Sequence, residues 1–221
     1  MAVYLHETAF RRLSETELQA WADAEAAAVS DCLERSMAMD GGLAPLDRSM
    51  RLVGQARTVR CMVGDNSALH AALTRVQPGE VLVADAGGFL GTAVWGGLMT
   101  QASLRKGLAG LVLDGAVRDR AEIVEHNFPC FARGSVPAGP HKGFGGAIDG
   151  PIACGGVAVH PGDLIVADGD GVTVVPLDRV EATLVAYKAL KEKEAKALAA
   201  LEAGGTLAEI YGVPEIKQVR D

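Results

Sequence analysis

The sequence predicts a mixed α/β fold, and three observations carry this prediction. Apolar, strand-like runs begin at Val81 and at Gly110, each after a turn or stop residue. Capping signals at Ser14 and at Asp65 begin helix-like segments in the same half of the chain. From Pro129 onwards the pattern changes to short strands separated by Pro and Gly turns. This order is too irregular for the alternation of a Rossmann fold.

The expected helices have start or stop signals. Ser14-Glu15-Thr16-Glu17 fits a capping box, and the Ala-rich stretch after it predicts a helix up to Gly41-Gly42. Asp65-Asn66-Ser67 predicts the start of a helix that runs through Leu73. Two further helices are expected at 94–106 and 178–203. The expected strands are 54–63, 81–85, one from 110 that turns at Gly115, 129–131, 151–159, 163–168 and 172–175.

Composition limits the class of protein. The chain has 221 residues, 49% of them hydrophobic, which is enough for one substantial core. Its net charge of −7 and its lack of a basic run argue against a nucleic-acid partner. The sequence shows neither an export signal nor an apolar run of membrane-spanning length. We therefore expect a cytoplasmic protein that has no membrane segment.

The cysteines and histidines show no metal-binding spacing. No CxxC pair occurs, so the four cysteines are expected to be reduced thiols of the core. No HxH or HExxH pattern occurs either, so the five histidines are expected to be mostly structural or surface residues. The residues concerned are Cys32, Cys61, Cys130, Cys154, His6, His70, His126, His141 and His160.

Arg118 and Asp119 follow the apolar strand that begins at Gly110. We expect Gly115 to let the backbone turn, so that both charged side chains emerge at the strand's end. There the carboxylate suits a hard metal ion and the guanidinium suits an anionic oxygen. An Arg-Asp ion pair that merely closes a loop is an equal alternative from these two residues alone.

A second candidate feature is Trp95-Gly96-Gly97-Leu98, which lies close to an expected helix start. Backbone N–H groups at a helix start have no partner within the helix and can hold a carboxylate.

Five segments of the chain lie in a characteristic order: Gly64-Asp65-Asn66, Pro78–Val83, Trp95–Leu98, Gly110–Asp119 and Pro161–Val172. In combination, they resemble the class II pyruvate aldolase and RraA-like family. The resemblance runs from about 31 to about 204 and keeps the order of the segments. It implies a swivelling β/β/α fold in a single domain, with a core at about 31–177 and a C-terminal helical segment at about 178–212. It also implies a homotrimer or homohexamer.

The resemblance assigns roles to particular residues. Asp119 would be the direct protein ligand of Mg²⁺ or Mn²⁺, and a 2-oxo acid would chelate that ion. Arg118 would bind the keto oxygen and stabilise the developing enolate. Backbone N–H groups around Gly96, Gly97 and Leu98 would hold the substrate carboxylate, and Asn66 would border the same cleft. From the C-terminal helix, Glu194 (or its competitor Glu192) would reach across the subunit interface.

The sequence departs from the family at one position. The family's aldolases have an acidic residue twenty-one positions before the arginine, and here that position is Gly97. Aldol cleavage needs a base for the hydroxyl proton, whereas decarboxylation of oxaloacetate needs only an electron sink. Gly97 therefore weakens the expectation of aldol cleavage more than that of decarboxylation, unless another acid or a group of the substrate substitutes.

Two functions follow from the resemblance. The first is a divalent-metal-dependent lyase that cleaves a C–C bond of a 2-oxo acid and releases pyruvate. Its substrates would be 4-hydroxy-4-methyl-2-oxoglutarate, 4-carboxy-4-hydroxy-2-oxoadipate or oxaloacetate. The alternative is a non-catalytic RraA-like protein that binds and inhibits an RNA-degrading enzyme. Arg118, Asp119 and Glu194 favour the lyase, because a docking protein does not need them. A methyltransferase activity has no support, since no cofactor-binding glycine motif precedes an acidic strand end.

Overall fold

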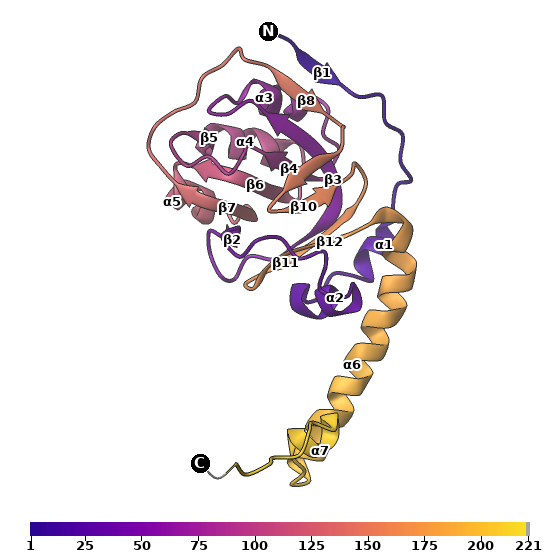
Figure 1. Cartoon of the computed structure of the whole chain (residues 1–221). Coiled ribbons are helices and arrows are strands. Elements are labelled where there is room, and N and C mark those ends of the chain that lie inside the picture. The colour runs from indigo at the N-terminus through magenta and orange to yellow at the C-terminus, as the bar shows by residue number, and fades with distance from the viewer. Residues whose placement is uncertain (220–221) are drawn as a thin grey trace.

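Within residues 1–219, which the computed structural model describes, a ten-stranded mixed sheet forms the centre of the molecule (Figure 1). The strand order is β1-β8-β3-β4-β6-β7-β2, β5 pairs with β6, and β11 pairs with both β3 and β12. A separate hairpin joins β9 to β10. The strands are β1 Val3–Leu5, β2 Ala44–Pro45, β3 Leu52–Cys61, β4 Val81–Asp85, β5 Ala93–Trp95, β6 Gly110–Val117, β7 Cys130–Ser135, β8 Gly146–Ile148, β9 Ile152–Cys154, β10 Val157–Val159, β11 Leu164–Asp168 and β12 Gly171–Val175.

Seven α-helices and one short 3₁₀ helix accompany these strands in the described part of the chain. Most of the helices are short, and only α6 is long. The α-helices are α1 Glu15–Gln19, α2 Ala26–Cys32, α3 Ser67–Leu73, α4 Gly97–Arg105, α5 Arg120–Glu125, α6 Val180–Glu202 and α7 Leu207–Tyr211.

The sheet's parallel part positions the functional residues. Strands β3, β4, β6 and β7 run parallel to one another, so their carboxyl ends share one edge. Strand β5 is parallel to β6 and pairs Trp95 with Val117. The residues that follow β5 are therefore brought beside those that follow β6. All eight residues of β6 are buried, which fixes the position of this edge.

The Ala-rich stretch after Ser14 does not form the single helix that the sequence predicted. The capping box is present, but α1 ends at Gln19 and α2 begins only at Ala26. The backbone in between forms local turns, and tertiary hydrogen bonds hold its end. The Asp168 carboxylate accepts from the N–H of Ala26 at 2.9 Å, and the Arg51 guanidinium donates to the carbonyl of Ala24 at 2.9 Å. Local helix propensity is overridden here by packing against the sheet.

Several other expectations were wrong in their boundaries, and the strand expected at 151–159 is the hairpin of β9 and β10. The apolar residues at 93–95 form strand β5, and the helix expected from 94 begins at Gly97. Gly115 does not turn the chain, since β6 continues through it to Val117. A Cβ at this position would lie 2.9 Å from the Cβ of Ala86, so the glycine permits close packing. The chain turns instead at Asp119, whose backbone is left-handed with φ of 57°.

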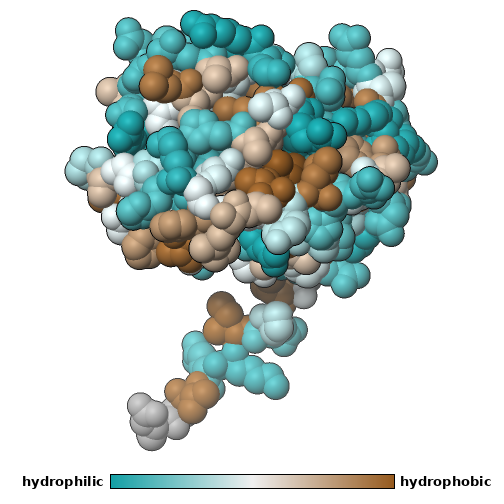
Figure 2. Space-filling view, turned by 90° about the horizontal axis from the view of Figure 1, so that it is seen from above, coloured by the Kyte–Doolittle hydropathy of each residue, from teal (hydrophilic) through white to brown (hydrophobic). Residues whose placement is uncertain are grey.

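The C-terminal helix α6 leaves the body of the molecule and carries α7 at its far end (Figure 1). Near the body, α6 contributes Val180 and Tyr187 to a second apolar cluster, in which Tyr187 stacks on the buried ring of Trp21. Apolar residues gather in patches among polar ones on the face shown in Figure 2. None of the helices in residues 1–219 is both long and apolar enough to cross a membrane.

Candidate active site

A cavity of about 110 Å³ lies at the carboxyl ends of β5 and β6. Arg118 and Asp119 follow β6, and the segment from Ala93 to Met99 supplies another wall. Asn66 and His70 line it from the start and the body of α3, and Pro140 and Lys142 line it from the loop before β8. Four of the predicted site residues, Asn66, Gly96, Leu98 and Arg118, therefore meet Asp119 around one space.

Asp119 is held in place from two sides. It is the residue before α5, and its left-handed backbone turns the chain from β6 into that helix. A non-glycine residue with positive φ is uncommon, although aspartate tolerates this conformation better than most residues. Its Oδ2 accepts a hydrogen bond from the N–H of Gly97 at 3.0 Å. The carboxylate thus lies at the positive end of the α4 dipole, which favours its negative charge.

Arg118 lies between Gly96 and the loop before β8. Its N–H donates to the carbonyl of Trp95 at 2.9 Å, which continues the pairing of β5 with β6. Its Nε lies 3.5 Å from Asp119 Oδ2, so the ion pair expected from the sequence exists but is loose. Both side chains are more than two-fifths exposed, which leaves them accessible to a ligand.

Gly96 and Gly97 are required by the side chains around them. A Cβ at Gly96 would lie 2.6 Å from Asp119 Oδ2 and 3.0 Å from Arg118 Cγ. A Cβ at Gly97 would lie 2.0 Å from Glu122 Oε2. Because the Gly97 N–H is bound to Asp119, the helix-start donors left for a substrate carboxylate are those of Leu98 and Met99. The Gly97 N–H is therefore already occupied, and the binding of a substrate carboxylate at this helix start stays a prediction.

Asn66 presents an unpartnered acceptor at the cavity. Its Nδ2 donates to the carbonyl of Val94 at 3.1 Å, whereas its Oδ1 is buried and has no partner among the described residues. Buried polar atoms are nearly always paired, so this oxygen marks a place for a donor from a ligand or water. The Asx turn before α3 positions the residue, since Asp65 Oδ1 accepts from the N–H of Ser67 at 2.8 Å.

Sequence reasoning missed His70 and Lys142 as site residues. His70 lies on α3, and partial burial and the charge of Lys142 lower its pKa below the usual range, against an opposing effect of Asp65. Lys142 reaches the cavity because its loop is bound to the turn before α3. There the N–H of His141 donates to the carbonyl of Gly64 at 2.8 Å, and the N–H of Asn66 donates to the carbonyl of His141 at 3.1 Å.

The residues present fit a hard divalent ion. Asp119 offers one carboxylate beside open space, and Mg²⁺ is usually bound through one or two carboxylates while it keeps waters. Within residues 1–219, no three His, Cys, Asp or Glu side chains gather into a site made of protein ligands alone. An ion at Asp119 would therefore complete its coordination with water and substrate. The cysteines take no part, since three of the four are buried and all are free thiols.

Glu194 lies outside the cavity. It is on α6 and pairs with Lys191 on the same helix at 2.7 Å, while Lys191 also reaches Glu25. Within one chain, Glu194 therefore does not meet Arg118 and Asp119. Its expected contribution across a subunit interface, like that of Glu192, stays a prediction.

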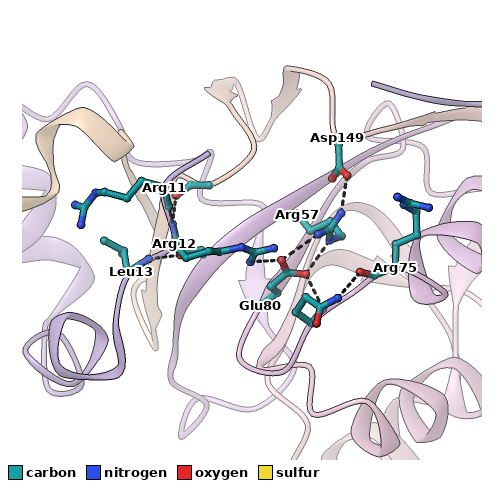
Figure 3. Close-up of polar contacts among 10 residues, drawn as sticks. Arg11, Arg12, Leu13, Arg57, Arg75, Glu80 and Asp149 are labelled. Atoms are coloured by element: carbon teal, nitrogen blue, oxygen red, sulfur yellow. Dashed lines mark hydrogen bonds and ion pairs between the residues drawn. The ribbon is translucent and has the colours of Figure 1, made fainter. Parts of the chain in front are cut away.

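A second polar cluster lies in the body of the sheet and has a structural role. Arg57 of β3 donates to Glu80 at 2.7 Å and to Asp149 at 2.5 Å, and Arg12 adds a further ion pair to Glu80 (Figure 3). Arg57, Glu80 and Asp149 are all buried. The cluster connects the N-terminal segment to the sheet, and none of its residues lines the cavity at Arg118 and Asp119.

Comparisons with known proteins agree with this geometry. The sequence model of the family described as RraA-like, Aldolase/RraA, matches residues 26–174. A relative from Halalkalibacterium halodurans, named putative 4-hydroxy-4-methyl-2-oxoglutarate aldolase, is 42% identical over 71% of this chain and 74% of its own length. A relative from Thermus thermophilus, named 4-hydroxy-4-methyl-2-oxoglutarate aldolase, is 37% identical over 57% of this chain and 76% of its own length.

A solved structure shows the same fold. RraAS2 of Streptomyces coelicolor, described as an unusual member of the RNase ES inhibitor RraA protein family, superposes with a TM-score of 0.76 at 30% identity. The match covers 86% of this chain and 98% of that protein. The predicted α/β fold of the RraA-like type is thus confirmed. With more than half of its residues matched by the family's sequence model, the chain belongs to the RraA-like family of aldolases and RraA proteins.

Proposed function

We propose that this chain is a divalent-metal-dependent lyase that cleaves a C–C bond of a 2-oxo acid and releases pyruvate. The observation that carries the proposal is the placement of Arg118 and Asp119. They lie together at the end of β6, with the Asp119 carboxylate held by the N–H of Gly97 and the Arg118 guanidinium beside it. A carboxylate that suits a hard cation thus lies beside a guanidinium that suits an anionic oxygen.

The charges around the cavity suit an anionic substrate. Arg118 and Lys142 supply two cationic side chains, and the start of α4 supplies N–H groups that favour a carboxylate. The 2-oxo acids named above carry two or more carboxylates. One carboxylate can be held by the start of α4 while another meets Lys142. Asn66 Oδ1 is available to accept from a substrate hydroxyl or from water.

The reaction needs a place for the electron pair of the broken bond. Mg²⁺ or Mn²⁺, when bound at Asp119, would supply a Lewis acid that polarises the 2-oxo group. Arg118 would donate to the keto oxygen as negative charge develops on it, which lowers the barrier for either leaving group. In decarboxylation the departing group is CO₂, and in aldol cleavage the substrate hydroxyl must also lose its proton.

The test is pyruvate release, followed through a coupled lactate dehydrogenase, from 4-hydroxy-4-methyl-2-oxoglutarate and from oxaloacetate with Mg²⁺. Free divalent ions decarboxylate oxaloacetate slowly, so an Asp119→Ala variant at the same protein and metal concentration supplies the baseline. Pyruvate formation well above that baseline with either substrate supports the proposal. Rates equal to the baseline with both substrates contradict it.

The likeness to RraAS2 favours a second candidate function, inhibition of an RNA-degrading enzyme by docking. The net charge of −7 suits a basic partner. In this case the purified chain retains a ribonuclease from a lysate at low salt and releases it as salt rises, because screening weakens charge pairing. Arg118→Lys and Asp119→Asn variants would then bind the partner as the unmodified chain does.

A further inference from the structure

The backbone conformation of Gly97 does not require a glycine. This residue is the first of α4, and its φ lies outside the left-handed range in which glycine is favoured. Any residue type would be allowed by the backbone at such a position. The space of a side chain is filled by Glu122, because a Cβ at Gly97 would lie 2.0 Å from its Oε2, 2.4 Å from its Cδ and 2.6 Å from its Oε1. The Glu122 carboxylate thus occupies the space of a side chain at 97.

Glu122 is fixed in that space by its neighbours. It lies on α5, where its Oε1 accepts from Gln101 Nε2 of α4 at 2.8 Å and lies 3.8 Å from His126 Nε2. The carboxylate is 39% exposed, so water can reach it. Gln101 therefore holds Glu122 against the start of α4 without burying it.

Two carboxylates meet at one glycine. Asp119 is the residue before α5, and Glu122 is the third residue of that helix. The N–H of Gly97 donates to Asp119 at 3.0 Å, while the Cα of Gly97 faces Glu122. A second carboxylate thus lies against Gly97, although residue 97 itself is not acidic.

We propose that Glu122 is a positioning residue of the active site, which supplies from α5 the carboxylate that Gly97 lacks and holds water beside Asp119. The inference rests on the proposed lyase function. In aldol cleavage, the proton of the substrate hydroxyl passes through this water to Glu122, and the O–H electron pair forms the new carbonyl. The electron pair of the C–C bond moves to the 2-oxo group of the pyruvate half. The proton then returns from Glu122 through water to the carbon that becomes the methyl group of pyruvate.

The first test is Glu122→Gln, which keeps the shape of the side chain and an acceptor for Gln101 but cannot accept a proton. We expect kcat for 4-hydroxy-4-methyl-2-oxoglutarate to fall about 100-fold while KM changes about twofold. A direct readout without substrate is Mn²⁺ affinity by electron paramagnetic resonance, which we expect to weaken about tenfold, as for other groups that hold a metal's water. Glu125→Gln, an exposed carboxylate of the same helix, is the matched control and should leave both quantities unchanged.

The second test exchanges the two positions. Glu122→Ala should lose activity as Glu122→Gln does, and Gly97→Asp alone should gain none, because its side chain meets the Glu122 carboxylate. The double variant Gly97→Asp with Glu122→Ala places an acid in the vacated space. Its kcat should recover to within about fivefold of the unmodified chain, well inside the range of one general-base group. Recovery in the double variant also excludes a purely structural loss in Glu122→Ala.

The outcomes separate this inference from the proposed function. An active unmodified chain whose Glu122→Gln variant keeps both its kcat and its Mn²⁺ affinity overturns the role of Glu122 alone. A double variant no more active than Glu122→Ala overturns it as well. An unmodified chain that forms no pyruvate from either substrate overturns the proposed function and, with it, this inference.

Discussion

The backbone N–H of Gly97 donates to Asp119 Oδ2 across 3.0 Å, so the first residue of α4 holds the carboxylate of the residue before α5. This bond joins the end of β5 to the end of β6 in the place where the two strands already pair. It uses one oxygen of Asp119 and leaves the other free to meet a cation. The orientation of the carboxylate is therefore fixed before any ligand arrives.

The first prediction concerns the charge of Asp119. Asp119→Asn keeps an oxygen that can accept from Gly97, so the turn should fold as before, but it removes the negative charge. We expect Mn²⁺ affinity to fall about 100-fold or more, because an ion at this site has one direct protein carboxylate. Isothermal titration measures the affinity, and Asp178→Asn, an exposed aspartate elsewhere, is the control. Equal affinities in the two variants would show that the ion does not bind at Asp119.

The second prediction concerns the shape of the Arg118 side chain. Arg118→Lys keeps the positive charge but loses the planar guanidinium with its two parallel N–H donors. In the structure, this guanidinium lies close to Gly139, since its Nη1 is 3.0 Å from where a Cβ on that glycine would be. We expect kcat to fall about 100-fold, the usual cost of one donor to a developing oxyanion. Steady-state kinetics with pyruvate detection measures it, with Arg105→Lys at the exposed end of α4 as the control. A decrease no larger than that of the control would show that a point charge suffices.

The third prediction concerns the charge state of His70. Burial and then Lys142 lower its pKa, so the imidazole is neutral at neutral pH and takes up a proton only on acidification. Replacing Lys142 by Met removes one of these effects and should raise the pKa of His70. Titration of the His70 Cε1 proton by nuclear magnetic resonance measures the shift, with Lys106→Met as the control. An unchanged or lower pKa would mean that Lys142 does not face His70 in solution.

The fourth prediction concerns the buried cluster around Arg57. Burial disfavours ionisation of Glu80, but hydrogen bonds from Arg57, Gln77 and Arg12 outweigh it and hold the pKa of Glu80 below its usual range. Burial raises the pKa of Asp149 instead, and its Oδ1 lacks a partner among the described residues. At neutral pH, Glu80→Gln should therefore cost about 3 to 5 kcal/mol of unfolding free energy, and Asp149→Asn about 1 kcal/mol or less. Urea unfolding of both variants measures the difference, and equal costs would contradict it.

The same cluster fixes the sign of the pH dependence. The folded pKa of Glu80 lies below its unfolded value, so its contribution to stability is present above that value and is lost as the pH falls. For Asp149 the sign is opposite, since its contribution is present at acid pH and is lost as the pH rises through its raised folded pKa. Glu80→Gln should therefore unfold with a weaker dependence on pH below about pH 5 than the unmodified chain.

Local patterns were enough to predict part of the site. The apolar run from Gly110 and the charged pair after it identify β6 and its end, because a buried strand and its terminal polar residues are consecutive in the chain. The sequence predicts that α4 starts at Val94, because the short apolar stretch around this residue fits a helix as well as a strand. Only the pairing of Trp95 with Val117, a contact between distant segments, decides in favour of β5.

The residues that the sequence missed differ in how they could have been found. His70 follows Asn66 by four positions, which puts both on one face of a helix. Helical spacing could therefore have predicted that His70 lies at the cavity. Glu122 follows Asp119 by three, but helix α5 itself was not predicted. Lys142 had no local signal, because only the backbone bonds between His141 and the turn at Gly64 bring its loop to the cavity.

The dependence of pyruvate formation on the divalent ion tests whether Arg118 and Asp119 form a metal-dependent lyase site. The unmodified chain is assayed with 4-hydroxy-4-methyl-2-oxoglutarate as isolated, after removal of metal with a chelator, and after return of Mg²⁺ or Mn²⁺. The account predicts that chelation abolishes pyruvate release, that either ion restores it, and that neither ion restores it in Asp119→Asn. Pyruvate release that is unaffected by the chelator, or restored equally in Asp119→Asn, would contradict a metal-dependent lyase site at Arg118 and Asp119.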